Sequence, residues 1–290
     1  PDGKTIMIDV DGTQKNAWLT CIHYCNLIAS AGYSLESDYT KNFAIHNENS
    51  NENIFTIPLD KMLYLNEFHY LFRSRHYAHG GAYGGASENG TCATLHTMAV
   101  YGYNTPSPDT RLDLNFYTGK VEVDGNYVTL DDGKPLEYKP LAVEQNLTAS
   151  QYIETAGARM KKYEVDRTAY SDGRMPNNDI VLYRYADVML MKAEAKVRNG
   201  ESGDEELNAV RNRVGMPSLP ATLDNILNER LLELVWEGWR RQDMIRFGTY
   251  NKPYDIHTPS EADNKGYTTV FPIPGKAREL NPNLEQNPGY

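Results

Sequence analysis

Three amphipathic stretches between Asn178 and Phe247, joined by short connections, constrain the fold of this chain more than any other feature. The first is expected to start at an Asn/Asp cap at residue 178 and to end at Gly200. Its apolar residues share one helical stripe: Leu182, Tyr185, Ala186, Met189, Ala193 and Val197. The second and third are expected as single helices at residues 204–215 and 223–247. Helices joined so closely favour antiparallel hairpins, so we predict a mainly α fold.

Residues 1–60 are predicted to add one helix and one short strand. Apolar residues recur at helical spacing from Gln14 to Ser30, with Thr13 placed to cap the start and Gly32 to end the helix. The apolar run Ile54–Ile57, just before a proline, predicts a strand. This part therefore continues the helical architecture.

The third stretch, NERLLELVWEGWRRQDMIRFG, is rich in arginine but carries no basic surface. The predicted helix as a whole holds five acids and four arginines. We expect the pairs Glu237–Arg241 and Asp243–Arg246, which contribute only a few tenths of a kcal/mol each. Gly238 within a helix costs about 1 kcal/mol relative to alanine, so we expect another element to pack closely there. We interpret this stretch as a packing seam that contacts no ligand.

Residues 61–170 differ from both ends of the chain. Segments such as EFHYLFRSRHYAHGGAYGGASENG and VDGNYVTLDDGKPLEY are dense in Gly, Asn, Asp and Tyr. They predict short strands and hairpins around a long loop, and such loops are often functional. The chain has 21 Tyr against 7 Phe, and tyrosine suits surfaces that are half wet and half apolar. We therefore expect the recognition surface in this region.

Catalytic and metal-binding motifs are missing from the sequence. HGGAYGG resembles an esterase oxyanion loop, but no G-x-S-x-G element supplies a nucleophile. His76 and His79 lack a nearby Cys/His pair that would complete a zinc site. DVDG at residues 9–12 resembles the start of a calcium loop, but the acid expected at the twelfth position falls on Thr20. We predict no catalytic residue, no metal and no cofactor.

Net charge and hydropathy exclude two further classes of protein. Acidic residues outnumber basic ones 39 to 29, which is the opposite of what a nucleic-acid-binding protein shows. No apolar run approaches the roughly 18 residues that a membrane-spanning helix needs. We predict neither a nucleic-acid partner nor a transmembrane segment within these residues.

Five motifs follow one another in the C-terminal half: RYADVMLMKAEA, NAVRNRVG, ERLLELVWEGWRRQDMIRFG, FPIP and NPNLEQNPGY. Their order and spacing resemble the SusD/RagB family of surface lipoproteins from Bacteroidota-type Gram-negative bacteria. YCNLIASAGYSLESDYTKNFAIHNENSNENIFTI resembles the helix and strand that precede them in the family. The matched segments cover about half of the chain, at both of its ends.

This resemblance implies tetratricopeptide-like helical hairpins with an irregular, loop-rich insertion of short strands. It implies a non-catalytic protein that captures a glycan at the outer-membrane surface and delivers it to a SusC-like TonB-dependent transporter. We expect residues 1–60 and 171–290 to form the helical core and tail, and residues 61–170 the variable ligand-binding region. The family's N-terminal helices and lipoprotein signal are absent from these 290 residues. Membrane attachment is therefore expected through a lipid anchor on the missing part.

Candidate ligand contacts follow from the chemistry of sugars, because the family's own contacts lie in variable loops. Sugar C–H faces stack on aromatic rings, and sugar hydroxyls need amide, imidazole or phenol partners. The variable region offers this mixture in eleven residues: Tyr64, Phe68, His69, Tyr70, Tyr77, His79, Tyr83, Asn89, Tyr101, Tyr103 and Asn104. Some of these rings are expected to pack the insertion onto the helices instead.

Three other functions stay open at this point. A RagB-like member of the family would bind a peptide in place of a glycan. A helical-repeat scaffold for a protein partner would need an exposed apolar groove. A glycoside hydrolase would need two carboxylates facing each other across a pocket.

Overall fold

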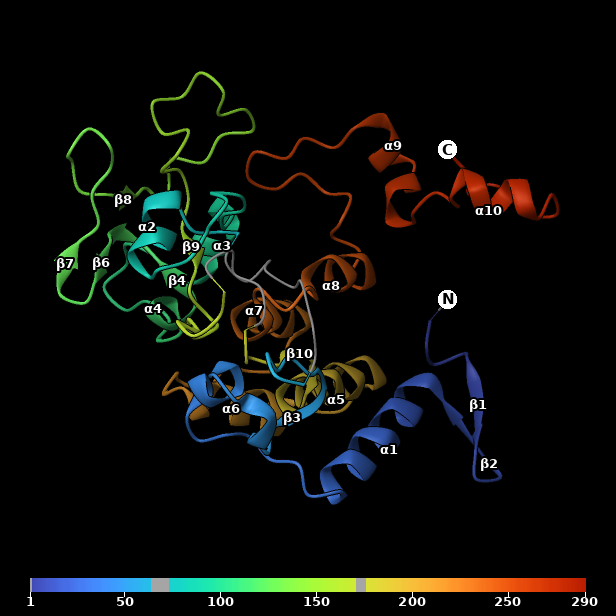
Figure 1. The fold of residues 1–290 in the computed structure, drawn as a ribbon. Coiled ribbons are helices and arrows are strands. Elements are labelled where there is room, and N and C mark those ends of the chain that lie inside the picture. The colour runs from blue at the N-terminus through green and yellow to red at the C-terminus, as the bar shows by residue number, and fades with distance from the viewer. Residues whose placement is uncertain (1, 64–72, 171–175) are drawn as a thin grey trace.

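The structure is a computed structural model, and it describes residues 2–63, 73–170 and 176–290. Five longer or central helices form a helical body: α1 Ala17–Ser30, α5 Tyr185–Asn199, α6 Asp204–Arg213, α7 Leu223–Leu234 and α8 Arg240–Arg246. α5 packs against α1, α6 and α7 (Figure 1). Small and branched side chains fill the space between these helices, including Ala186, Leu190, Leu207 and Ile226. The predicted mainly α fold of helical hairpins is confirmed.

Short antiparallel strand pairs complete the fold. β1 Met7–Val10 and β2 Thr13–Asn16 form a hairpin that precedes α1. β3 Asn53–Ile57 pairs with β10 Ile180–Arg184, a strand that lies far from it in the sequence. The inserted region holds three pairs: β4 Phe116–Tyr117 with β9 Arg159–Met160, β5 Gly119–Lys120 with β8 Glu137–Tyr138, and β6 Glu122–Val123 with β7 Asn126–Tyr127. It also holds α2 Tyr77–Ala82, α3 Leu95–Val100 and α4 Leu112–Asn115.

Two predicted helix starts are wrong, because strand pairing takes the first residues. Residues 13–16 pair with β1, so α1 begins at Ala17, and the Asn16 side chain replaces Thr13 as its cap by accepting from the Leu19 amide at 2.8 Å. Residues 180–184 pair with β3, so α5 begins at Tyr185. The predicted strand at Ile54–Ile57 is confirmed, and its backbone needs this partner.

The third predicted helix is broken into α7 and α8. The chain leaves the helix after Leu234, and Trp236 (φ +67°) and Gly238 (φ +84°) adopt left-handed backbone conformations before α8 begins at Arg240. A Cβ on Gly238 would meet nothing within 4 Å, so the expected close packing is wrong. Glycine is favoured here because the backbone turns through a positive φ.

Glu237 lies in this break and does not form the expected pair with Arg241. Its carboxylate turns inward, where the Arg184 guanidinium donates to it at 2.8 Å and the Lys162 ammonium also binds. The other expected pair, Asp243 with Arg246, is present at 2.9 Å.

The C-terminal arm, residues 251–290, extends away from the helical body (Figure 1), and none of its side chains is fully buried. It contains α9 Glu261–Asn264 and α10 Gly275–Leu280. The NPNLEQNPGY motif folds back on FPIP: the Gln286 side chain both accepts from and donates to the Ile273 backbone, at 2.8 and 3.0 Å. The Asn287 amide donates to the Phe271 carbonyl at 2.7 Å. These bonds explain why the two motifs occur together.

A buried ion-pair network, centred on Glu233 of α7, joins the helical body to the insertion. The two oxygens of this carboxylate bind Arg184 at 2.6 Å and Arg111 at 2.7 Å, and one of them also binds Arg213. Arg184 reaches on to Glu52 at 2.6 Å. The network contains five cations and five anions, so its formal charges cancel: Arg111, Lys162, Arg184, Arg211 and Arg213 with Glu52, Asp109, Glu229, Glu233 and Glu237.

Removal of the central carboxylate is expected to destabilise the whole chain. Glu233→Gln leaves buried guanidinium groups without their anion, so we expect the free energy of unfolding to fall by about 3–5 kcal/mol in urea denaturation. The matched control is Glu261→Gln, since Glu261 pairs with Lys265 at the surface and should change stability by less than about 0.5 kcal/mol. A fall below about 1 kcal/mol for Glu233→Gln would contradict the central role of the network.

The same carboxylate predicts acid sensitivity. Burial alone would raise the pKa of Glu233, but the guanidinium groups of Arg213, Arg184 and Arg111 outweigh it and hold the pKa well below its usual 4.5. As the pH falls, Glu233 is therefore protonated in the unfolded chain before it is protonated in the folded chain. The stability that its ionised carboxylate provides above pH 4.5 is lost as the pH approaches the lower pKa of the folded state. We expect the unfolding free energy to fall less steeply with acid in Glu233→Gln than in the wild type. Urea denaturation at several pH values from about 5 to 3 measures this dependence. If the unfolding free energy changed equally with pH in both proteins, Glu233 would not be the source of the acid sensitivity.

Candidate functional site

An open groove of 420 Å³ lies on the insertion, between the turn that follows α3 and the segment that follows β8. Tyr103 and Asn104 form one wall. Gly102 (φ +69°) and Asn104 (φ +65°) both adopt left-handed conformations, and the Tyr103 amide donates to the Met98 carbonyl at 2.9 Å. This tight turn fixes the Tyr103 ring, which also packs on the core next to α3.

The opposite wall comes from residues 139–152, later in the chain, and it contributes Lys139, Pro140, Leu141, Ala142 and Tyr152. The Lys139 backbone holds this wall, because its amide donates to the Thr155 carbonyl and its carbonyl accepts from Gly157, both at 2.8 Å. The Lys139 ammonium lies 2.8 Å from Glu137 and stays partly exposed. Leu141 is 55% exposed, so an apolar surface remains open to a ligand.

The groove thus combines two half-buried tyrosine rings with an amide and an ammonium. Aromatic faces accept the apolar faces of a ligand, and the polar groups fix its orientation by hydrogen bonds. Across the described residues, no three His, Cys, Asp or Glu side chains converge as a metal site would require. In the same parts of the chain, no helix is long and apolar enough to cross a membrane.

The predicted site residues do not form one cluster. Tyr103 and Asn104 lie in the groove, whereas Tyr77 is 59% exposed on α2 and Asn89 lies in a left-handed turn (φ +48°). Tyr83 packs on His79, with ring centroids 5.4 Å apart, beside a much smaller cavity. Four predicted contacts fall outside the described residues: Tyr64, Phe68, His69 and Tyr70.

Two predicted ligand contacts are corrected, because His79 and Tyr101 are completely buried. The Tyr101 hydroxyl donates to the Leu232 carbonyl of α7 at 2.6 Å and accepts from Asn115 at 2.9 Å, which attaches the insertion to the helical body. His79 lies 3.0 Å from the Tyr138 hydroxyl, and burial lowers its pKa to about 3, so the imidazole is neutral. Neither ring has a surface to offer a ligand.

Lys139, Leu141 and Tyr152 were missed from the sequence. Only Tyr152 carried a signal, as another tyrosine of the loop-rich region. Its proximity to Tyr103 depends on backbone pairing between Lys139 and Ala156, which no local pattern predicts.

The arrangement defines a class of helical-hairpin protein in which a loop-rich insertion carries an open groove. This chain belongs to the SusD family, whose profile matches residues 26–290. It is 32% identical over 140 residues to the starch-binding protein SusD of Bacteroides thetaiotaomicron, an alignment that spans 46% of this chain and 25% of that protein.

Two solved structures share the fold. Surface glycan-binding protein A from Bacteroides thetaiotaomicron is 25% identical, with a TM-score of 0.69. The same protein in complex with laminarihexaose superposes with a TM-score of 0.68 at 24% identity. Each alignment covers 93% of this chain and 59% of the other, so the chain spans only part of the length of its relatives.

Two neighbouring tyrosines are expected to respond differently to loss of the hydroxyl. Tyr101→Phe leaves the buried Leu232 carbonyl without its donor, so we expect the free energy of unfolding to fall by about 1–3 kcal/mol. Tyr103→Phe serves as the matched control and should stay within about 0.5 kcal/mol of the wild type. Chemical denaturation measures both, and equal effects would refute the anchoring role of Tyr101.

Proposed function

We propose that this chain binds a glycan in the groove between Tyr103 and Tyr152 and catalyses no reaction on it. The observation that carries the proposal is the pairing of two partly exposed rings with Asn104 and Lys139 on a SusD-family fold. Sugar rings have apolar faces that stack on tyrosine and equatorial hydroxyls that need polar partners. An open groove suits an extended oligosaccharide better than it suits a small molecule, which would need an enclosed site.

The names of the relatives support this ligand class. One is a starch-binding protein, and another is a surface glycan-binding protein solved with a laminari-oligosaccharide. These names describe binding proteins and not enzymes. Because the chain covers only part of each relative, the ligand and the lack of catalysis are proposals for this protein.

The parts of the chain have different roles in this proposal. Residues 61–170 form the ligand-binding insertion, while residues 1–60 and 171–290 provide the helical support and the tail. Family membership supports a place at the cell surface, on the outer membrane. A SusC-like transporter as partner, and a lipid anchor, extend the proposal beyond the residues of this chain.

Removal of either groove ring is expected to weaken glycan binding. Tyr103→Ala and Tyr152→Ala each delete one stacking face, so we expect affinity to fall about 5- to 30-fold, or about 1–2 kcal/mol. Isothermal titration with maltohexaose and laminarihexaose, followed by a wider glycan array, measures the loss.

Tyr77→Ala provides the matched control, because Tyr77 is an exposed tyrosine that lies outside the groove. Its affinity should equal that of the wild type. Unchanged binding in both groove variants, or release of shorter sugars from the bound glycan, would overturn the proposed function.

A further inference from the structure

A second cavity, of 460 Å³, lies between the insertion and the break that separates α7 from α8. Residues 91–97, which lead into α3, form one side. The other side is formed by Phe116, by Trp236 and by Arg240 and Arg241 of α8. Its volume is typical of a site for one small molecule, and its walls are mostly apolar.

Arg240 and Arg241 line this cavity without a carboxylate partner. Within the described parts of the chain, neither guanidinium forms an ion pair, whereas Arg230 and Arg246 beside them both do. Arg240 donates to the Leu227 carbonyl at 2.9 Å and lies 3.4 Å from the ring nitrogen of His96. Arg241 donates to a carbonyl of the C-terminal arm at 2.8 Å.

The anions near this pair are already engaged. Asp243 binds Arg230 and Arg246, and Asp255 accepts from the backbone amide of His96. Among the residues that the structure describes, no acidic one lines the cavity, in a chain whose net charge is −10. Burial lowers the pKa of Arg240, so a nearby anion would stabilise its charged form.

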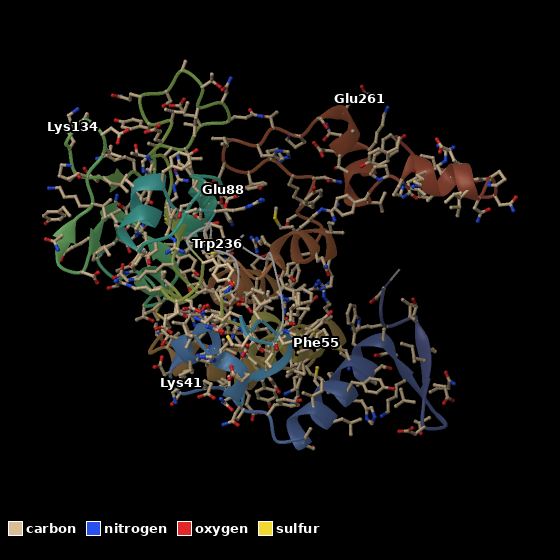
Figure 2. All side chains as sticks on the ribbon, in the orientation of Figure 1. Lys41, Phe55, Glu88, Lys134, Trp236 and Glu261 are labelled. Carbon is tan, nitrogen blue, oxygen red and sulfur yellow. The ribbon has the colours of Figure 1, made fainter. Side chains whose placement is uncertain are left out.

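Trp236 forms an aromatic wall of this cavity. A bulky residue in the left-handed region costs on the order of 1–3 kcal/mol and persists only where its surroundings impose it. The indole donates to the Asn115 carbonyl at 3.2 Å, and its ring centroid lies 5.7 Å from that of Phe116. These contacts hold an aromatic wall against the cavity, and Figure 2 shows Trp236 between the insertion and the helical body.

We propose that this cavity binds an anionic sugar unit, whose apolar ring face packs on the Trp236 wall and whose carboxylate or sulfate is held by Arg240 and Arg241. Charge complementarity selects the anion, and the aromatic wall selects a ring. This inference rests on the proposed function only in taking the ligand to be a sugar, because the anionic group is inferred from the arginines themselves. The cavity is separate from the Tyr103 groove, and the two sites share no lining residue.

Titration with charged and neutral oligosaccharides tests the inference. The probes are tetragalacturonate, a sulfated galacto-oligosaccharide and neutral maltohexaose, measured at low and at raised salt. We expect at least one acidic probe to bind the wild type and to lose at least tenfold in affinity in Arg240→Gln/Arg241→Gln. Binding of that probe should weaken with salt and survive Tyr152→Ala. Arg278→Gln, an exposed arginine of the tail, is the control for the loss of positive charge.

Cys92 provides a second measurement that needs no arginine variant. Cys92 is one of the residues that line the cavity, and burial raises the pKa of its thiol, so alkylation is followed by mass spectrometry at mildly alkaline pH. The bound acidic probe should slow the alkylation of Cys92 in the wild type, while maltohexaose should not. Peptide mapping separates Cys92 from Cys21 and Cys25.

The outcomes distinguish this inference from the proposed function. If no acidic probe binds, or if binding persists in the double variant and leaves Cys92 unprotected, the inference is overturned. The proposed function still stands in that case if a neutral glycan binds and depends on Tyr103 and Tyr152. Acidic binding that requires the arginines, together with no effect of the tyrosine variants on any glycan, would support the inference and refute the groove.

Discussion

The carboxylate of Glu233 is the point at which three parts of the molecule meet. It binds Arg184 from the strand before α5, Arg213 from the end of α6 and Arg111 from the insertion. Breaking such a buried pair costs far more than a surface pair, because the remaining charge has no solvent to stabilise it. The network therefore does more than fill the core: it fixes where the loop-rich insertion sits on the helices.

The break between α7 and α8 follows from the same requirement. A continuous helix would send Glu237 along the helix surface toward Arg241, whereas the break turns its carboxylate inward to Arg184 and Lys162. The backbone conformation at Trp236 is the cost of this turn, and its ring becomes a wall between body and insertion. The inward position of Glu237 and the aromatic wall of the second cavity thus both depend on this break.

The sequence predicts those elements whose signals are local. Gly200 ends α5 in a left-handed cap, and the strand at Asn53–Ile57 follows from a short apolar run. Prediction from the sequence fails where contacts between distant residues determine the secondary structure. Residues 180–184 continue the apolar pattern of α5, yet they form a strand because they pair with β3. In the groove, Tyr103 and Asn104 were within reach of sequence reasoning. Tyr152 carries only the general signal of a tyrosine in the loop-rich region, and nothing local separates Tyr103 from the buried Tyr101 two residues earlier.

The helical body thus supports a loop-rich insertion that the ion-pair network holds in place, and we propose that this insertion binds the glycan. The most direct test of glycan capture in the groove is a crystal structure of this chain with the neutral oligosaccharide that binds it best. We expect sugar rings stacked on Tyr103 and Tyr152, with hydroxyls within hydrogen-bonding distance of Asn104 or Lys139. An ordered oligosaccharide bound elsewhere, with the groove empty, would contradict it.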